Sequence, residues 1–178
     1  MREAATPFFK LRMTDRVPRW IVAWFVVSGV LQSFDLAFIM LRPRSLASAN
    51  GDLASLFDFH NRIYLDLDPS YGDLTATAPV AQVAMNSIES LLALFAIAVL
   101  RGPRRFAVLA VVAAMSFWKT VSYFSFSGIH SWSDFHNTNF FLFLAAPTSL
   151  WIIFPPLVLV RCLRGIDALT AQAKAKKN

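Results

Sequence analysis

The sequence is poor in cysteine and in charged residues, and each shortage excludes a class of protein. Cys162 is the only cysteine, so an intramolecular disulfide and a cysteine-based zinc cluster are both excluded. Charged residues make up 16% of the chain and hydrophobic residues 56%, which is too apolar for an ordinary soluble domain. There is also no phosphate-binding glycine loop, no nucleophile-elbow motif and no His-Glu-x-x-His metal motif. We therefore expect neither a metal nor a cofactor.

Four long apolar runs account for the excess of hydrophobic residues. They are Trp20–Leu41, Pro79–Leu100, Phe106–Phe126 and Phe140–Val160. Each is about 20 residues, the length that a helix needs to cross a hydrocarbon core of about 30 Å. The runs lack the period-two alternation of a membrane barrel. The sequence therefore predicts an all-α membrane protein built as a bundle of four transmembrane helices.

The net charge of +6 would suit a nucleic-acid partner, but the positions of the charges indicate a membrane topology instead. Most Lys and Arg residues precede the first run, separate the second from the third, or follow the fourth. Positive residues favour the cytoplasmic side, so we expect both termini there. This divides the chain into a cytoplasmic segment (1–19), a transmembrane domain (20–163) and a cytoplasmic basic tail (164–178). Lys174 and Lys176 in that tail resemble a dilysine signal for retrieval to the endoplasmic reticulum.

The loops carry fewer signals. Residues 42–78 form a long loop whose amphipathic piece, around Leu53–Leu67, is expected to lie on the membrane surface or to cap the bundle. The tight turn at 101–105 makes the second and third spans antiparallel neighbours. His60, His130 and His136 are expected outside the spans on the luminal side, the last two as solvated loop residues.

Polar residues inside the runs are the strongest functional signal, because an ionisable group in lipid is costly and usually faces the bundle interior. They repeat at helical spacing in all four runs: Ser28, Gln32 and Asp35; Gln82, Asn86 and Glu89; Ser116, Lys119, Thr120 and Tyr123; Thr148 and Trp151. At a rise of about 1.5 Å per residue, they fall within a slab on the order of 10 Å thick. We therefore expect one shared intramembrane cavity. The structural alternative is that Lys119 pairs with Asp35 or Glu89 and that the other groups only join helices.

Several of these residues belong to a larger pattern running from about Trp20 to the C-terminus. It comprises Trp24–Gly29 with Gln32 and Asp35, the Tyr64-x3-Asp68-x2-Tyr71 spacing, Glu89, Val121–Phe124 and Ser149–Trp151. The pattern resembles the emopamil-binding (EXPERA-domain) family, which includes the sterol Δ8–Δ7 isomerase and the sigma-two receptor. The resemblance implies a four-helix EXPERA bundle around a hydrophobic ligand, embedded in membrane lipid, and it allows a homodimer.

The sequence departs from the isomerase at positions that the resemblance makes functional. Gln32 stands where the isomerase has a proton-handling histidine, and Thr148 replaces an asparagine. Lys119 and Thr120 replace a glycine and an aspartate. We therefore expect a rewritten cavity and a reaction other than sterol Δ8–Δ7 isomerisation.

Two functions suit this cavity. The first is an intramembrane isomerase or cyclase acting by proton transfer on a sterol, terpenoid or related natural product. A carboxyl buried in an apolar cavity stays protonated and can donate, so Glu89 is the expected acid and Asp35 the base. Trp151 would hold a carbocation; the remaining residues expected to bind substrate are Gln32, Asn86, Lys119, Thr120, Tyr123 and Thr148. The second is a non-catalytic sterol- or amphiphile-binding protein of sigma-two-receptor type.

Overall fold

Four long helices dominate the computed structural model, which describes residues 16–126 and 138–176. They are α1 (Arg19–Met40), α3 (Thr77–Ala98), α4 (Gly102–Phe126) and α6 (Ala146–Ala175). All four are long and apolar enough to cross a membrane, and the described residues form no strand. The predicted all-α, four-span architecture is confirmed. His130 and His136 lie outside the described residues.

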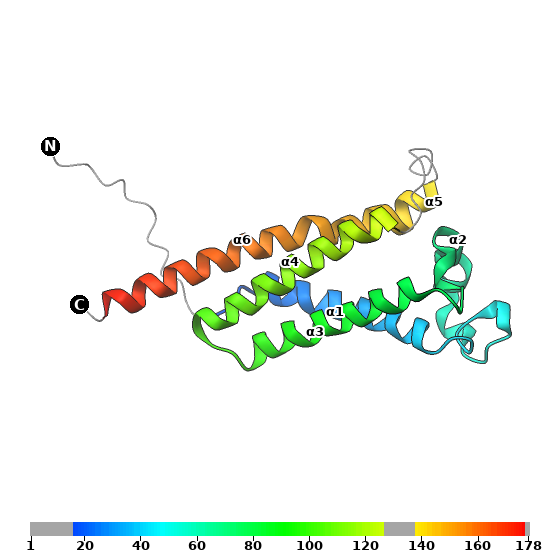
Figure 1. The fold of residues 1–178 in the computed structure, drawn as a ribbon, viewed down its shortest axis with the longest axis horizontal. Helices are drawn as coiled ribbons and strands as arrows, with labels where there is room; N and C mark the ends of the chain where they lie inside the picture. Colours follow the sequence, from blue (N-terminus) through cyan, green and yellow to red (C-terminus); the bar gives the residue numbers. More distant parts are fainter. Residues whose placement is uncertain (1–15, 127–137, 177–178) are drawn as a thin grey trace.

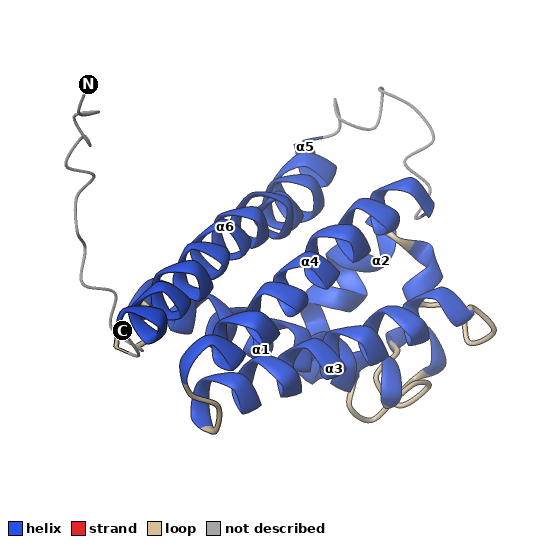
Figure 2. Cartoon of the chain, turned by 60° about the vertical axis from the view of Figure 1, so that its left-hand side comes forward, coloured by secondary structure: helices blue, strands red, loops and turns tan. Residues whose placement is uncertain are grey.

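The long helices alternate in direction along the bundle (Figure 1). Helix α1 packs against α3, α3 against α4, and α4 along α6, as both views show (Figure 1, Figure 2). Gly102, with a φ of 60°, reverses the chain between α3 and α4, a conformation that glycine adopts at little cost. The expected tight turn between antiparallel neighbours is therefore present.

Helix α6 is longer than its apolar sequence predicts. It follows α5 (Thr138–Phe140) and a π-helical turn (Phe141–Ala145), and it continues to Ala175 although the apolar run ends at Val160. Backbone hydrogen bonds do not require apolar side chains, so a helix continues into a charged segment rich in alanine. Most of the predicted tail thus extends α6 without a break.

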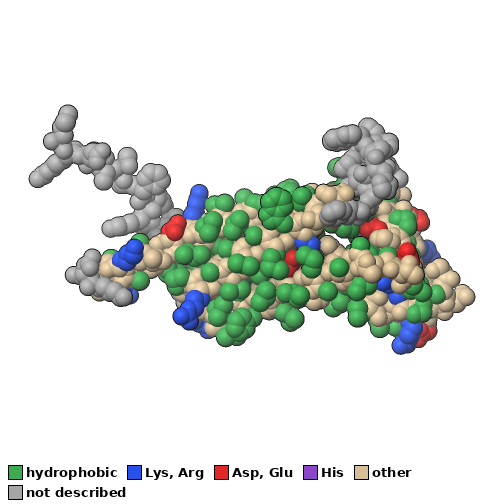
Figure 3. Space-filling view, viewed as in Figure 1, with side chains coloured by type: hydrophobic (Ala, Val, Ile, Leu, Met, Phe, Trp, Pro, Cys, Tyr) green, Lys and Arg blue, Asp and Glu red, His purple; other side chains and the backbone are tan. Residues whose placement is uncertain are grey.

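On the face shown in Figure 3, apolar side chains cover much of the bundle, and most charged ones gather toward its two ends. Inside, the end that carries the α3–α4 turn is closed by a core that includes Ile21, Phe106, Leu109 and Val158, each fully buried. Gly165 lets α6 approach α4 there, because a Cβ atom at this position would lie 3.1 Å from the Phe106 ring. This end of the bundle is solid.

The opposite end is covered by the first loop, which we call the cap (residues 42–76). Its short helical turns include His60–Tyr64, α2 (Leu65–Leu67) and Pro69–Tyr71. Phe57 and Tyr71 of the cap pack with Phe38 of α1 and Val83 of α3 in one buried cluster. Of the two positions predicted for the amphipathic piece, the structure has it capping the bundle.

Candidate functional site

Eight of the nine residues predicted for the site surround one small cavity between the four helices, which we call the inner chamber. Its volume is about 100 Å³. The chamber is lined by Leu31, Gln32, Asp35, Tyr64, Tyr71, Gln82, Asn86, Lys119, Thr120, Tyr123, Thr148 and Trp151. The i, i+4, i+7 spacing of the polar residues explains this convergence, because such residues share one face of a helix.

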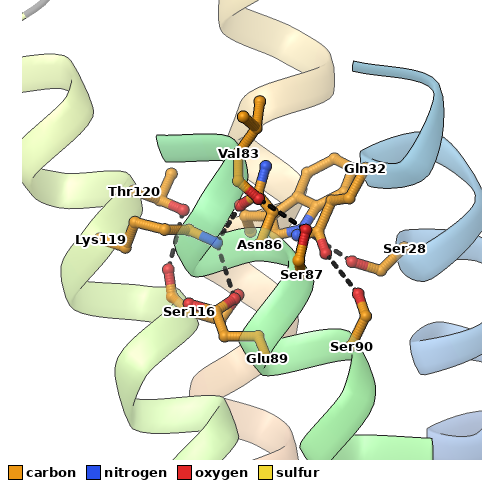
Figure 4. A network of polar contacts seen from close by, with 11 residues as sticks. Ser28, Gln32, Val83, Asn86, Ser87, Glu89, Ser90, Ser116, Lys119 and Thr120 are labelled. Carbon is orange, nitrogen blue, oxygen red and sulfur yellow. Dashed lines mark hydrogen bonds and ion pairs between the residues drawn. The ribbon is translucent and has the colours of Figure 1, made fainter. Parts of the chain in front are cut away.

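The ninth residue, Glu89, lies behind Lys119 and is not among the residues that line the chamber. Lys119 Nζ donates to Glu89 Oε2 at 2.7 Å and also to Asn86 Oδ1 (Figure 4). The two charged side chains are only 3% and 4% exposed. Of the two partners proposed for Lys119 on sequence, Glu89 is the one observed. Lys119 therefore links Glu89 to the chamber, because it contacts Glu89 and also lines the chamber wall.

The second oxygen of Glu89 is the least satisfied atom of this group. Oε1 is buried and makes no hydrogen bond of standard geometry, although Ser116 lies beside it (Figure 4). An ion pair removed from water needs further hydrogen bonds to offset its desolvation. The hydrogen bonds that Lys119 donates to Asn86 and to Glu89 offset part of the desolvation cost of this ion pair.

Asp35 carries the second carboxylate of the chamber, and its partner comes from the cap. His60 Nε2 lies 2.9 Å from Asp35 Oδ1. The His60 ring is buried and stacked on Phe38, with centroids 4.5 Å apart. His60 Nδ1 has no hydrogen-bond partner, which favours the tautomer with hydrogen on Nε2, donating to Asp35. Asp35 itself is 32% exposed at the side chain and lines the chamber.

Sequence reasoning placed His60 outside the spans and gave it no role. The two residues of the pair are 25 positions apart, and neither helical spacing nor a motif connects them. The contact arises because the cap folds back onto α1. The amphipathic pattern around Leu53–Leu67 was the only signal in the sequence that this loop packs on the bundle, and it does not show which residues the loop contacts.

Trp151 and Gln32 are held by hydrogen bonds between helices. Trp151 Nε1 donates to Ser28 Oγ at 2.9 Å, which joins α6 to α1. Ser90 Oγ donates to Gln32 Oε1 at 3.0 Å, which joins α1 to α3. The Trp151 indole N–H is therefore occupied, while its ring remains part of the chamber wall.

Buried and half-buried phenols form the boundary between chamber and cap. Tyr123 of α4 donates to Asp68 Oδ2 at 2.8 Å, and its hydroxyl lies 3.3 Å from that of Tyr64. Asp68 Oδ1 accepts from the backbone and hydroxyl of Ser70. Burial raises the pKa of Tyr64 and of Tyr71, so both phenols of the cap stay protonated at neutral pH and can donate hydrogen bonds.

A second, larger cavity adjoins the chamber and lies between α3, α4 and the cap. We call it the outer cavity; its volume is about 760 Å³. Four residues line both spaces and form the wall between them: Tyr71, Gln82, Lys119 and Tyr123. Basic and acidic atoms are visible near α4 in the middle of the apolar surface (Figure 3).

The chain matches no protein-family model, no curated protein and no solved structure. Within residues 16–126 and 138–176, no group of three His, Cys, Asp or Glu side chains is placed to hold a metal ion. This part of the chain therefore offers the Lys119–Glu89 ion pair, the Asp35–His60 hydrogen-bonded pair, several hydroxyl and amide groups, and aromatic rings.

Proposed function

We propose that this protein is an intramembrane isomerase that moves a double bond by proton transfer in a hydrophobic sterol, terpenoid or related natural product. One observation carries the proposal: the Asp35 carboxylate and the Lys119 ammonium line the same small chamber, and each has its own partner, His60 or Glu89. A base and a cationic hydrogen-bond donor are thus available to one bound molecule.

The pairing of Lys119 with Glu89 favours isomerisation over cyclisation. An ammonium group is too weak an acid to protonate an isolated alkene. It is well suited to stabilise negative charge that develops on an oxygen atom. The geometry therefore favours a substrate whose double bond lies next to a carbonyl group, rather than a polyene that needs a strong acid.

The proposed reaction takes place in two proton transfers. Asp35 removes a proton from the carbon between the carbonyl group and the double bond, and the electron pair of that C–H bond moves to form an enolate. The enolate oxygen accepts a hydrogen bond from Lys119. Asp35 then returns the proton to the far carbon of the former double bond, which restores the carbonyl group and completes the shift. No co-reactant is consumed, and substrate and product have equal mass.

The other predicted residues have supporting roles in this proposal. His60 orients Asp35, and Asn86 fixes Lys119. Trp151 supplies an aromatic face, and Thr148 and Tyr123 supply hydroxyl groups that line the chamber. Gln32 accepts a hydrogen bond from Ser90, and Thr120 donates one to the backbone of α4. Both residues therefore contribute mainly to the shape of the chamber.

A second candidate function is a binding protein for sterols or other amphiphiles. It is favoured by the fact that Lys119, Glu89 and Asp35 already have partners within the chain. A chamber of this kind can hold an oxygenated group without altering it. The two functions are separated by product formation.

The resemblance to the emopamil-binding (EXPERA) family supports a lipid-like substrate and remains part of the proposal.

We also propose a location in the endoplasmic reticulum membrane with both termini cytoplasmic. In support, the helix end that carries Arg161 and Arg164 and the turn that carries Arg101 and Arg104 lie at the same end of the bundle, opposite the cap. Reporter tags at each terminus and in the cap, tested with selective permeabilisation, check this topology.

The function is tested by mass spectrometry of lipids and prenylated metabolites from cells that make wild type, Asp35→Asn or Glu89→Gln at matched membrane levels. Asp66→Asn, the same type of change as Asp35→Asn but on the exposed surface of the cap, is the control. We expect an isomer of unchanged mass with wild type and the control, and its loss with Asp35→Asn. Identical metabolite profiles in all cells, together with a lipid that co-purifies with the protein, would refute the isomerase and support a binding protein.

A further inference from the structure

The inner chamber is too small for the body of the proposed substrate. Its volume of about 100 Å³ is well below the range of about 300–1,000 Å³ typical of sites for small organic ligands, so it has room only for a small polar group. A sterol or terpenoid skeleton does not fit there. If the reacting groups face the chamber, most of the substrate has to lie elsewhere.

The outer cavity has the size that the chamber lacks. Its volume of about 760 Å³ falls within the range of about 300–1,000 Å³ typical of sites for small organic ligands. Its sides are apolar and come from two neighbouring helices: Pro79, Ala81 and Met85 of α3 face Met115 and Trp118 of α4. This lining suits a rigid hydrocarbon body.

The outer cavity also opens in the direction of the bilayer. Trp118 is 65% exposed and Met85 is 40% exposed, and both lie in the spans, where the surrounding medium is lipid. A molecule dissolved in the membrane can therefore reach this cavity sideways, between α3 and α4, without crossing water.

The shared wall selects for one end of such a molecule. Lys119, Gln82 and Tyr71 bring N–H and O–H donors to the inner side of the outer cavity, while the Tyr123 hydroxyl already donates to Asp68. A hydrocarbon end gains nothing from these groups, whereas an oxygen atom accepts hydrogen bonds from them. Lys119 is the charged residue of this wall, and its charge is balanced by Glu89, while the Asp68 carboxylate lines the same cavity. No net positive charge at the wall therefore attracts an anion, and a neutral hydroxyl or carbonyl group fits best.

We infer that the outer cavity is the binding site for the substrate body, entered from the bilayer between α3 and α4, and that the ligand is a neutral amphiphile with one oxygen function at its leading end. That oxygen reaches the shared wall, while the hydrocarbon stays between the two helices. The inference rests on the proposed function for the identity of the reacting groups, but its test measures binding alone.

The test uses a photoreactive, alkyne-tagged C20 isoprenoid alcohol on purified full-length protein in lipid nanodiscs. Ala81→Trp fills the outer cavity. Ala84→Trp, one turn further along the exposed side of α3, is the matched control because it lines none of the cavities described above. In wild type we expect labelled peptides within residues 78–85 and 115–123. Labelling should fall at least tenfold in Ala81→Trp and stay at the wild-type level in Ala84→Trp.

A second probe, the same isoprenoid without its hydroxyl group, distinguishes a site from general lipid contact. Equal labelling by both probes would overturn the inference, as would labelling that Ala81→Trp leaves unchanged. If Ala81→Trp does not purify as a folded protein, displacement of the probe from wild type by excess untagged alcohol, but not by the untagged hydrocarbon, decides the same question. If wild type forms no product, the isomerase is refuted. If labelling of the outer cavity nevertheless persists in wild type and in Asp35→Asn, the binding site stands without the reaction.

Discussion

Breaking the Lys119–Glu89 pair is expected to destabilise the bundle, whereas removing both members is expected to cost little. The Nζ–Oε2 distance of 2.7 Å corresponds to an attraction of about 6 kcal/mol at an effective dielectric constant of about 20. The cost of burying both charges offsets much of this. Removal of one partner of a buried pair usually costs about 3–5 kcal/mol, because the other charge stays buried without compensation. Replacement of both by apolar residues of similar size is often neutral.

The assay is a double-mutant cycle of Lys119→Met, Glu89→Met and the double variant in detergent, followed by the intrinsic fluorescence of the five tryptophans. With a shift of about 2–4 °C per kcal/mol for a chain of this size, each single variant should melt about 6–20 °C below wild type. The double variant should recover most of that loss. Additive losses would refute the reasoning, since they would mean that the two side chains do not stabilise each other.

Three further predictions follow from single contacts. His60→Phe keeps the packing on Phe38 but removes the hydrogen bond that holds Asp35; a bond worth about 1.5–3 kcal/mol implies a rate of product formation about 10- to 150-fold lower. Tyr123→Phe removes a donor from the buried Asp68 carboxylate and should lower stability in the melting assay by about 1.5–3 kcal/mol. Gly165→Ala places a methyl group against the fully buried Phe106 ring; the overpacking cost of about 1–3 kcal/mol exceeds the helix-propensity gain of about 1 kcal/mol, so the same assay should show a net loss of up to about 2 kcal/mol.

Controls make these three predictions decisive. Unchanged turnover in His60→Phe would contradict an orienting role for the histidine. A Tyr123→Phe variant as stable as wild type would mean that water replaces the phenol at Asp68. Leu163→Ala, on an exposed side of α6, is the control for the glycine variant, and an equal effect of the two would contradict close packing of α6 on α4.

The helices of this protein could be predicted from the sequence because the membrane leaves few alternatives. A run of about 20 apolar residues has to satisfy its backbone hydrogen bonds internally, so it forms a helix. The same logic placed eight site residues around one cavity. Gln32 and Asp35 lie three residues apart on α1, which is enough to put them on one side of the helix and away from lipid.

What the sequence could not predict depends on contacts between distant segments. The partner of Lys119 was left open between Asp35 and Glu89, because helical periodicity gives the face of a residue but not the rotation of one helix against another. The contact between His60 and Asp35 depends on how the cap folds, and short irregular turns have no long repeat to reveal them. The continuation of α6 beyond the apolar run could not be predicted, because hydropathy reports the medium around a helix and not its hydrogen bonds.

The site is divided into two cavities of very different volume, a feature that no residue pattern in the sequence shows. This division limits which molecules can react there. The outer cavity can hold a hydrocarbon body, but its apolar sides offer nothing to exchange protons. The inner chamber holds the base and the cation, but its volume of about 100 Å³ admits only a small group. Because Lys119 and Tyr123 belong to both, the wall is where a substrate held in one space can react with groups in the other. Each charge at this wall already has a partner in the chain, so a ligand needs no charge of its own to be accepted. A neutral, largely apolar molecule with a single oxygen at one end is the class of substrate that satisfies both spaces at once.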